Sequence, residues 1–310
     1  MQRSHAAVAV LLIVLAAMPR TSSAETPSAD LKAVVNGNTR FAVDLYSKLK
    51  DAEEGNLFLS PLSISTALAM TYGGARGNTA KEMAEALHFA LGQGKLHPAF
   101  AELQAGLDRV QKKGEVQLHT ANSLWPQKDY PFQQDYLSLV EKHYGSPITP
   151  VDYETASEEA RKIINKWVEK QTKEKIKNLI RQGDLDPATV LVLVNAIYFK
   201  GNWASQFDPD RTSLLDFTLR SGEKKQVPTM QQRGKFAYGE LEDVQVLELP
   251  YEGKELSMLI VLPRDPKGLP EIENTLSAEN IESWLSRPSQ QKVHVYLPKF
   301  KISWGTFDLK

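Results

Sequence analysis

Residues 189–199 read TVLVLVNAIYF, and this stretch decides the fold class. Apolar side chains occupy both sets of alternating positions, which is typical of a strand that is covered on both faces. Only Asn195 interrupts the apolar run. A strand of this kind needs a layer on each side, so we expect a sheet-centred α+β domain.

The segments that follow residue 199 also have strand patterns. Residues 244–251 and 256–263 predict two strands joined by the turn 252–254, which together form a hairpin. Residues 293–297 alternate apolar and polar side chains, which is typical of a strand with one buried face.

The chain before residue 189 has helical periodicity. The predicted helices cover 30–50, 61–74, 79–87, 100–110 and 136–140, and a sixth has its inward-facing residues over 156–168 and continues to 181. Ser60 and Pro61 read as an N-cap and a first helical residue, and residues 79–82 (TAKE) read as a capping box. Ile163 is expected on the inward face of its helix, and residues 57–59 are expected to form a short buried strand.

The N-terminus resembles a secretory signal peptide. Arg3 precedes an apolar run over 6–18, and a stretch of small residues ends at Ala24. A membrane anchor is the competing interpretation, but this run is shorter than the roughly 20 residues that a span requires. We therefore expect residues 1–24 to be a leader, residues 25–310 to be one domain, and no membrane association once the leader is removed.

Composition limits the classes of function. The chain has no cysteine, which excludes a disulfide framework and thiolate chemistry. A formal net charge of −1 provides no general attraction to nucleic acid. Export without disulfides or glycosylation sequons favours a location outside the cell or in a bacterial periplasm, and we expect a monomer.

No catalytic constellation is visible. The histidines lack metal-ligand spacing, and no G-x-S-x-G elbow is present. Residues 73–77 (GGARG) follow a helix and read as a turn, not as a phosphate loop. We expect no enzyme activity, no cofactor and no metal.

Two groups of basic residues leave a polyanion site open as a hypothesis. Five lysines lie on the helix predicted to run over 158–181, where intervening glutamates favour a solvated face. A smaller basic cluster consists of Arg109, Lys112 and Lys113.

Asn195 allows two interpretations. A buried amide without partners costs on the order of 1–3 kcal/mol, so we expect it to be hydrogen-bonded. It either specifies the core packing or acts as a polar latch where packed elements can separate.

Several segments, in order along the chain from about residue 30 to 310, resemble the serpin family. They are NLFLSPLSI (56–64), GGARGNT (73–79), VNAIYFKGNW (194–203), ELPY (248–251), LSMLIVLP (256–263) and LPKFKI (297–302).

The resemblance implies a fold of three sheets and roughly nine helices with a metastable main sheet. A protease would cleave an exposed loop, which then inserts into this sheet as a strand and traps the covalently bound protease. The resemblance places Ser60, Ser63 and Asn195 in a polar cluster that controls sheet opening. Trp203 and Lys299 match the region where the loop enters. Trp167 and Thr172 match the helix that crosses the sheet.

The resemblance also implies that a family member continues past the equivalent of Lys310 for roughly another 80–100 residues, which carry the reactive loop. We therefore expect this chain to be a C-terminally truncated fragment without a reactive bond. The expected function is inhibition of a serine, or else a cysteine, protease. The alternative is a non-inhibitory serpin that acts as a binding, carrier or chaperone protein, and the missing hinge would distinguish the two.

Overall fold

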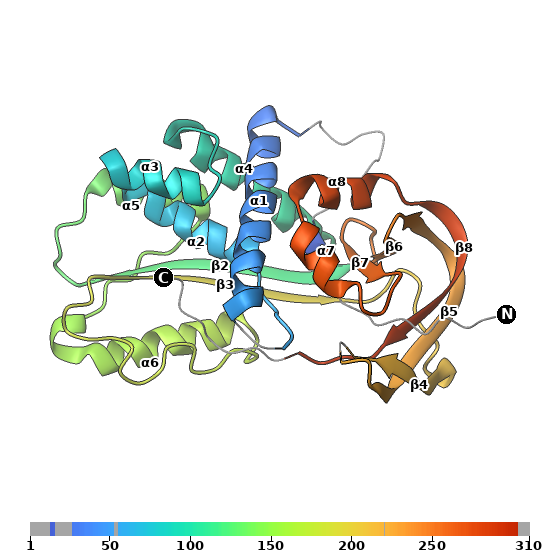
Figure 1. The fold of residues 1–310 in the computed structure, drawn as a ribbon. Coiled ribbons are helices and arrows are strands. Elements are labelled where there is room, and N and C mark those ends of the chain that lie inside the picture. Colours follow the sequence, from blue (N-terminus) through green and yellow to red (C-terminus); the bar gives the residue numbers. More distant parts are fainter. Residues whose placement is uncertain (1–12, 16–26, 53–54, 220, 303–310) are drawn as a thin grey trace. The chain divides into compact units, whose positions relative to one another are not determined.

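The computed structural model describes residues 13–15, 27–52, 55–219 and 221–302 (Figure 1). It contains two compact units. The first, which we call the helical unit, contains Glu25–Ala42 and Leu59–Lys200. The second, which we call the sheet unit, contains Val43–Phe58 and Gly201–Trp304.

The helical unit contains most of the helices and a two-stranded ribbon, β2–β3. Its elements are the first part of α1 (Ala29–Ala52), α2 (Pro61–Gly74), α3 (Gly77–Ala86), α4 (Gln93–Lys113), β2 (Val116–Pro126), α5 (Gln134–Tyr144), α6 (Tyr153–Gln171) and β3 (Leu191–Gly201).

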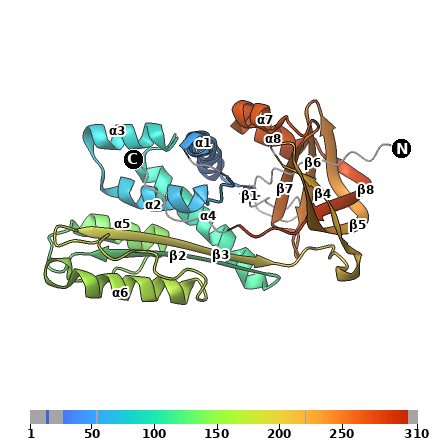
Figure 2. The ribbon, with the colours of Figure 1, turned by 60° about the horizontal axis from the view of Figure 1, so that its bottom comes forward.

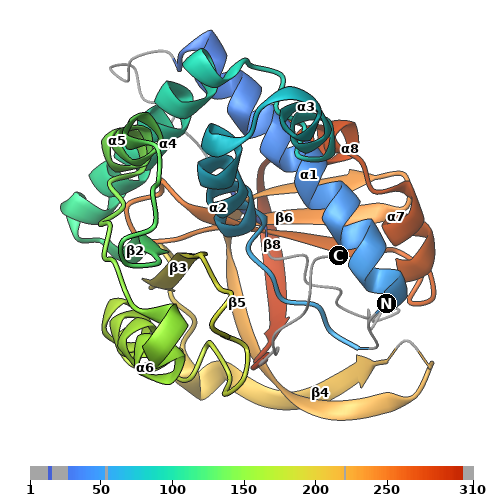
Figure 3. The same ribbon diagram turned by 90° about the vertical axis from the view of Figure 1, so that its left-hand side faces the viewer.

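Helices cover both faces of the β2–β3 ribbon, with α6 on one side and α2, α4 and α5 on the other (Figures 1, 2 and 3). Leu191 and Leu193 pack into the core formed with α2, α4 and α5. Val192 and Val194 pack against α6. Because side chains alternate along a strand, this arrangement explains the apolar run of residues 189–199 and confirms that β3 is covered on both faces.

The sheet unit is built around one long strand, β5. Its strands are β1 (Ile13–Leu15), β4 (Thr212–Thr218), β5 (Lys224–Leu241), β6 (Val244–Pro250), β7 (Ser257–Pro263) and β8 (Ser289–Pro298). A short 3₁₀ helix, η1 (Pro209–Arg211), precedes β4, and α7 (Leu269–Thr275) and α8 (Ala278–Ser286) follow β7.

The strand order is β1-β7-β6-β5-β4, and β8 also pairs with β5. The 18 residues of β5 allow it to pair with β4 near its start and with β6 near its end. β8 pairs antiparallel with β5 from Thr229 to Tyr238. The hairpin predicted over 244–263 is confirmed as β6 and β7, and Ile281 and Trp284 of α8 complete the core beside it.

Three local predictions were wrong: a short strand, the start of a helix and the burial of one side chain. Residues 57–59 form no strand, and Phe58 is 49% exposed. The capping box at 79–82 does not begin a helix, because α3 already starts at Gly77 after Arg76. Ile163 is 50% exposed and does not face inward, since it lies beyond the edge of the apolar stripe of α6.

The helix predicted to run to residue 181 ends earlier, at Gln171. Lys173, Glu174 and Asn178 have positive φ angles, which an α-helix does not accommodate. The exposed lysines of this segment therefore lie partly on α6 and partly on the turns that follow it.

The predicted leader, residues 1–24, lies outside the described residues except for β1, which pairs antiparallel with β7. No helix in the described part of the chain is long and apolar enough to cross a membrane.

Candidate functional site

The polar cluster begins at the N-terminus of α2. Ser60 is the N-cap, with Pro61 at the first helical position as predicted. The Ser60 hydroxyl accepts a hydrogen bond from the Ser63 backbone N–H at 3.4 Å and donates one to the Ser63 hydroxyl at 3.0 Å. Two of the three predicted cluster residues are therefore directly bonded.

Asn195, the third member, lies on β3 and bonds across the ribbon to β2. Its Nδ2 donates to Asn122 Oδ1 at 2.6 Å. Asn122 is itself buried, and its Nδ2 donates to the Tyr144 backbone oxygen at 3.4 Å. Asn195 Oδ1 is buried and has no hydrogen-bond partner among the described residues.

A cavity of about 20 Å³ connects the two halves of the cluster. Ser63, Asn122 and Asn195 all line it, together with the polar side chains of Thr66, Gln104 and Thr120. Its volume is sufficient for about one water molecule, and its lining offers that water several polar partners. The structure thus brings two of the three predicted cluster residues, Ser63 and Asn195, to one small cavity. Ser60 does not line this cavity and is connected to it through its hydrogen bonds to Ser63.

Asn122 was missed by the sequence analysis. It stands beside Ser123 in a segment whose next residues, Leu124 and Trp125, are fully buried. The residues around Asn122 include His119, Thr120 and Ser123, so the segment lacks the continuous apolar run that identified Asn195. The sequence does not show that β2 pairs with β3, and this pairing is what brings the two amides together.

A buried histidine lies near this cluster. His97 is 2% exposed, and its Nδ1 lies 2.7 Å from the Tyr144 hydroxyl. Burial, with smaller contributions from His143 and Arg76, lowers the pKa of His97 to about 4. Its Nε2 is buried and has no partner among the described residues. A neutral imidazole is therefore built into the core.

The two residues matched to the loop-entry region lie in the sheet unit. Trp203 stacks on Tyr251, with ring centroids 4.6 Å apart and an interplanar angle of 11°. The Lys299 backbone N–H donates to Pro228 at 2.8 Å, and the side chain is exposed. No hydrogen bond or ring contact joins Trp203 to Lys299 in the part of the chain that the structure describes.

The two residues matched to the sheet-crossing helix lie at the C-terminal end of α6. Trp167 packs edge-to-face on Trp125 of β2, with ring centroids 6.0 Å apart. Thr172 caps α6 and is 1% exposed. Its hydroxyl donates to the Val168 backbone oxygen at 2.8 Å and accepts from the Ile176 N–H at 3.2 Å. Thr172 therefore connects the last turn of α6 to the segment that follows.

A comparison with protein families matches residues 36–310 to the model "Serpin (serine protease inhibitor)". The chain belongs to the serpin family. Among the described residues of this serpin, no group of three or more histidine or acidic side chains could hold a metal ion.

The serpin is similar in sequence to named inhibitors. It is 42% identical to human leukocyte elastase inhibitor over 88% of the chain and 73% of the relative. It is 43% identical to the horse protein of the same name, over 90% of the chain and 75% of the relative. These relatives are inhibitors and not enzymes, in agreement with the lack of catalytic motifs.

Solved structures show the same fold. Emu ovalbumin superimposes with a TM-score of 0.83 at 34% identity, over 87% of this serpin and 74% of the ovalbumin chain. A loop-inserted structure of a cleaved ovalbumin mutant gives a TM-score of 0.79 at 30% identity, over 87% and 75% of the two chains. The serpin-like α+β fold is confirmed. The described residues form eight α-helices and two hydrogen-bonded sheets.

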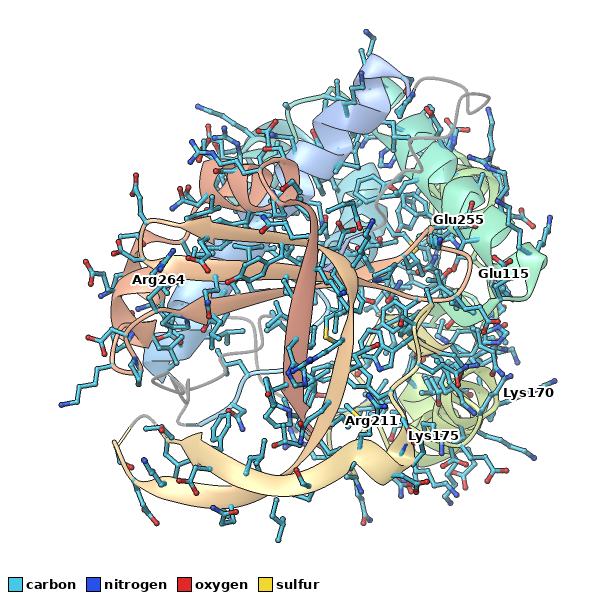
Figure 4. The ribbon with its side chains drawn as sticks, turned by 90° about the vertical axis from the view of Figure 1, so that its right-hand side faces the viewer. Glu115, Lys170, Lys175, Arg211, Glu255 and Arg264 are labelled. Carbon is cyan, nitrogen blue, oxygen red and sulfur yellow. The ribbon has the colours of Figure 1, made fainter. Side chains whose placement is uncertain are left out.

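The predicted basic groups of this serpin do not form an obvious polyanion site. Arg109, Lys112 and Lys113 are exposed at the end of α4. Lys170 and Lys175 are also exposed (Figure 4). Two other lysines of this segment have separate partners. Lys173 donates a hydrogen bond to Gln117 at 3.1 Å, and Lys177 forms an ion pair with Glu174 at 3.6 Å. This favours a solvated face.

Proposed function

We propose that this serpin inhibits a serine endopeptidase by cleavage of a reactive loop and insertion of that loop into the sheet that contains β3. The observation that carries the proposal is the 42% identity to human leukocyte elastase inhibitor over 88% of the chain. The loop-inserted ovalbumin neighbour supports the mechanism, because it shows this fold with a loop taken up after cleavage.

The β2–β3 ribbon supports insertion on physical grounds. Among the described residues β3 pairs only with β2, so its other edge has backbone N–H and C=O groups that can bind a further strand. The outer edge of β2 is partly occupied by residues 147–151. A strand added beside β3 would form main-chain hydrogen bonds along that edge.

The polar cavity under β3 supports a role in controlling this opening. Asn195 and Asn122 bond across the ribbon on the same side as Ser63, so a shift of β3 over α2 would disturb the cavity that all three line. We therefore assign Ser60, Ser63 and Asn195 to the latch, with Asn122 as an additional member. Trp203 and Lys299 remain the proposed loop-entry residues, and Trp167 and Thr172 the proposed residues of the yielding helix.

We further propose that the reactive loop is encoded after Lys310 and that residues 1–24 are removed on secretion. The family match begins at residue 36, so the proposed leader lies outside it. N-terminal sequencing of the exported protein should give Glu25 as the first residue. Recovery of the protein only inside the cell, with Met1 or Gln2 at its start, would contradict secretion.

The test of inhibition compares the complete reading frame, including any codons after Lys310, with the 310-residue chain. Each is mixed with pancreatic elastase, trypsin, subtilisin and, for the cysteine class, papain. We expect the complete product to form an SDS-stable complex near 1:1 with at least one serine protease, and the 310-residue chain to form none. A protease whose catalytic serine is replaced by alanine is the control and should form no complex.

Two outcomes would contradict this proposal. Cleavage of the complete product while all proteases stay active would favour the non-inhibitory alternative, a binding, carrier or chaperone protein. A stable covalent complex with the 310-residue chain would show that the reactive bond lies within residues 1–310.

A further inference from the structure

The outer face of β5 and β8 carries an open pocket of about 410 Å³ that the proposed inhibition does not use. Arg233 on β5 lies directly opposite His294 on β8 in the strand register. Gln231 lies two positions from Arg233, and therefore on the same face of the sheet. The intervening Gln232 is buried on the other face. The pairing of the two strands thus gathers polar side chains into one patch.

Positive charge dominates this pocket. Arg233 and Arg211, which ends η1, both line it, whereas Asp210 is the one carboxylate in its described lining. Arg233 makes no ion pair with a carboxylate in the described ranges, and its Nε donates to His294 Nδ1 at 3.4 Å. Arg211 Nε lies 3.7 Å from Asp208 Oδ2, but this pair is largely exposed and so holds the guanidinium weakly.

The positive charge of the two arginines also affects the imidazole of His294. Burial lowers the pKa of His294, and the nearby charges of Arg233 and Arg211 lower it further. Two guanidinium groups are therefore close enough to one ring to disfavour another positive charge there. A bound anion would relieve that repulsion.

A hydroxyl group completes the lining. It belongs to Ser213, which lies opposite Thr229 in the register and therefore on the same face as Gln231 and Arg233. The Ser213 hydroxyl accepts from the Gln231 amide at 2.8 Å, which leaves its own hydrogen free to donate. The pocket thus combines planar guanidinium donors with a hydroxyl donor, and this donor set suits a tetrahedral oxyanion.

We propose that this pocket binds a phosphate or sulfate group. Its volume lies in the range of sites for small organic ligands and exceeds the needs of a single oxyanion, so a small monoester fits as well as the free ion. The group is held by Arg211 and Arg233, with Ser213 as a hydroxyl donor.

The test is calorimetric titration of the full chain with inorganic phosphate, sodium sulfate and adenosine 5′-monophosphate at constant ionic strength set with chloride. We expect saturable binding with Kd in the millimolar range. Arg233→Gln and Arg211→Gln should each weaken it by about tenfold, because each removes a charge-assisted contact. Tighter binding of the monophosphate than of inorganic phosphate would identify a phosphate monoester as the preferred ligand. Equal binding of the two would show that the pocket recognises the oxyanion alone.

Arg264→Gln is the matched control. Arg264 belongs to the same unit, pairs with Glu240 at 2.9 Å, and lies away from Arg211 (Figure 4). Binding should be unchanged in this variant. The proposal is overturned if the wild-type chain shows no saturable binding, or if Arg264→Gln weakens binding as much as the two pocket variants. Equal thermal midpoints for all three variants would establish that they are folded.

Discussion

At the scale of single residues, the centre of the β2–β3 ribbon depends on two amides. Asn195 and Asn122 bond to each other at 2.6 Å beside a small cavity that both polar and apolar side chains line. Their hydrogen bond satisfies one donor and one acceptor, but Asn195 Oδ1 stays unpaired among the described residues. The amide pair is thus held less tightly than a fully satisfied one, which is what a latch requires.

Asn195→Ala should lower the thermal stability of the complete protein and raise the number of inhibitor molecules consumed per protease. The change leaves Asn122 Oδ1 buried without its donor, which costs on the order of 1–3 kcal/mol. Thermal unfolding and the stoichiometry of inhibition measure the two effects. Asn78→Ala is the control, because Asn78 is exposed on α3 of the same unit. If Asn195→Ala behaves like this control, the latch role is wrong.

His97 should make stability depend on pH. Its pKa is lowered to about 4 in the folded chain, whereas an unfolded histidine has a pKa near 6.5. The unfolded chain therefore binds more protons between these values. The stabilisation is complete above pH 6.5 and is lost as the pH falls toward 4.

The expected loss is about 3 kcal/mol of unfolding free energy between pH 7 and pH 4. His97→Gln, which stays neutral and can still bond Tyr144, should flatten this dependence in urea unfolding curves. Asn78→Ala, an exposed change in the same unit that removes no titratable group, should leave it unchanged. A wild-type-like slope in His97→Gln would contradict the assignment.

At the scale of elements, the end of α6 depends on a side chain more than on helix propensity. Helical periodicity continues past residue 171, but α6 stops there. The Thr172 hydroxyl bonds backward to Val168 and forward to Ile176, and so fixes how the chain leaves the helix. Turns with positive φ angles follow at Lys173 and Glu174.

Thr172→Val should destabilise the chain by about 1 kcal/mol, because it keeps the shape of the side chain but leaves the partly buried Ile176 N–H without its acceptor. The Val168 carbonyl still accepts from the Thr172 backbone N–H. Thr172→Ser keeps the hydroxyl and should retain most of the stability. Urea unfolding of both variants measures the difference. Equal losses in the two would show that the methyl group, and not the hydroxyl, matters here.

At the scale of the whole molecule, each unit has its own hydrophobic core. Because the chain has no cysteine, no disulfide bond stabilises either unit. α1 and β3 continue from one unit into the next along the chain. The proposed inhibition uses the ribbon of the helical unit, whereas the proposed anion pocket belongs entirely to the sheet unit. Variants of the pocket should therefore leave the latch intact.

The sequence alone determined the elements whose patterns are local. The hairpin over 244–263, the alternation in β8 and the N-cap at Ser60 were all predicted, since each depends on neighbouring residues in the chain. The order and spacing of its motifs also identified the family, which the comparison confirmed.

Only the tertiary structure decided which distant residues meet. Nothing near Asn195 in the chain indicates Asn122, and nothing near Arg233 indicates His294, because strand pairing brings each pair together. The same holds for the exposed Phe58 and Ile163, whose burial depends on what packs beside them. Periodicity reports which face of an element is apolar, whereas partners and cavities arise from contacts between segments far apart in the sequence.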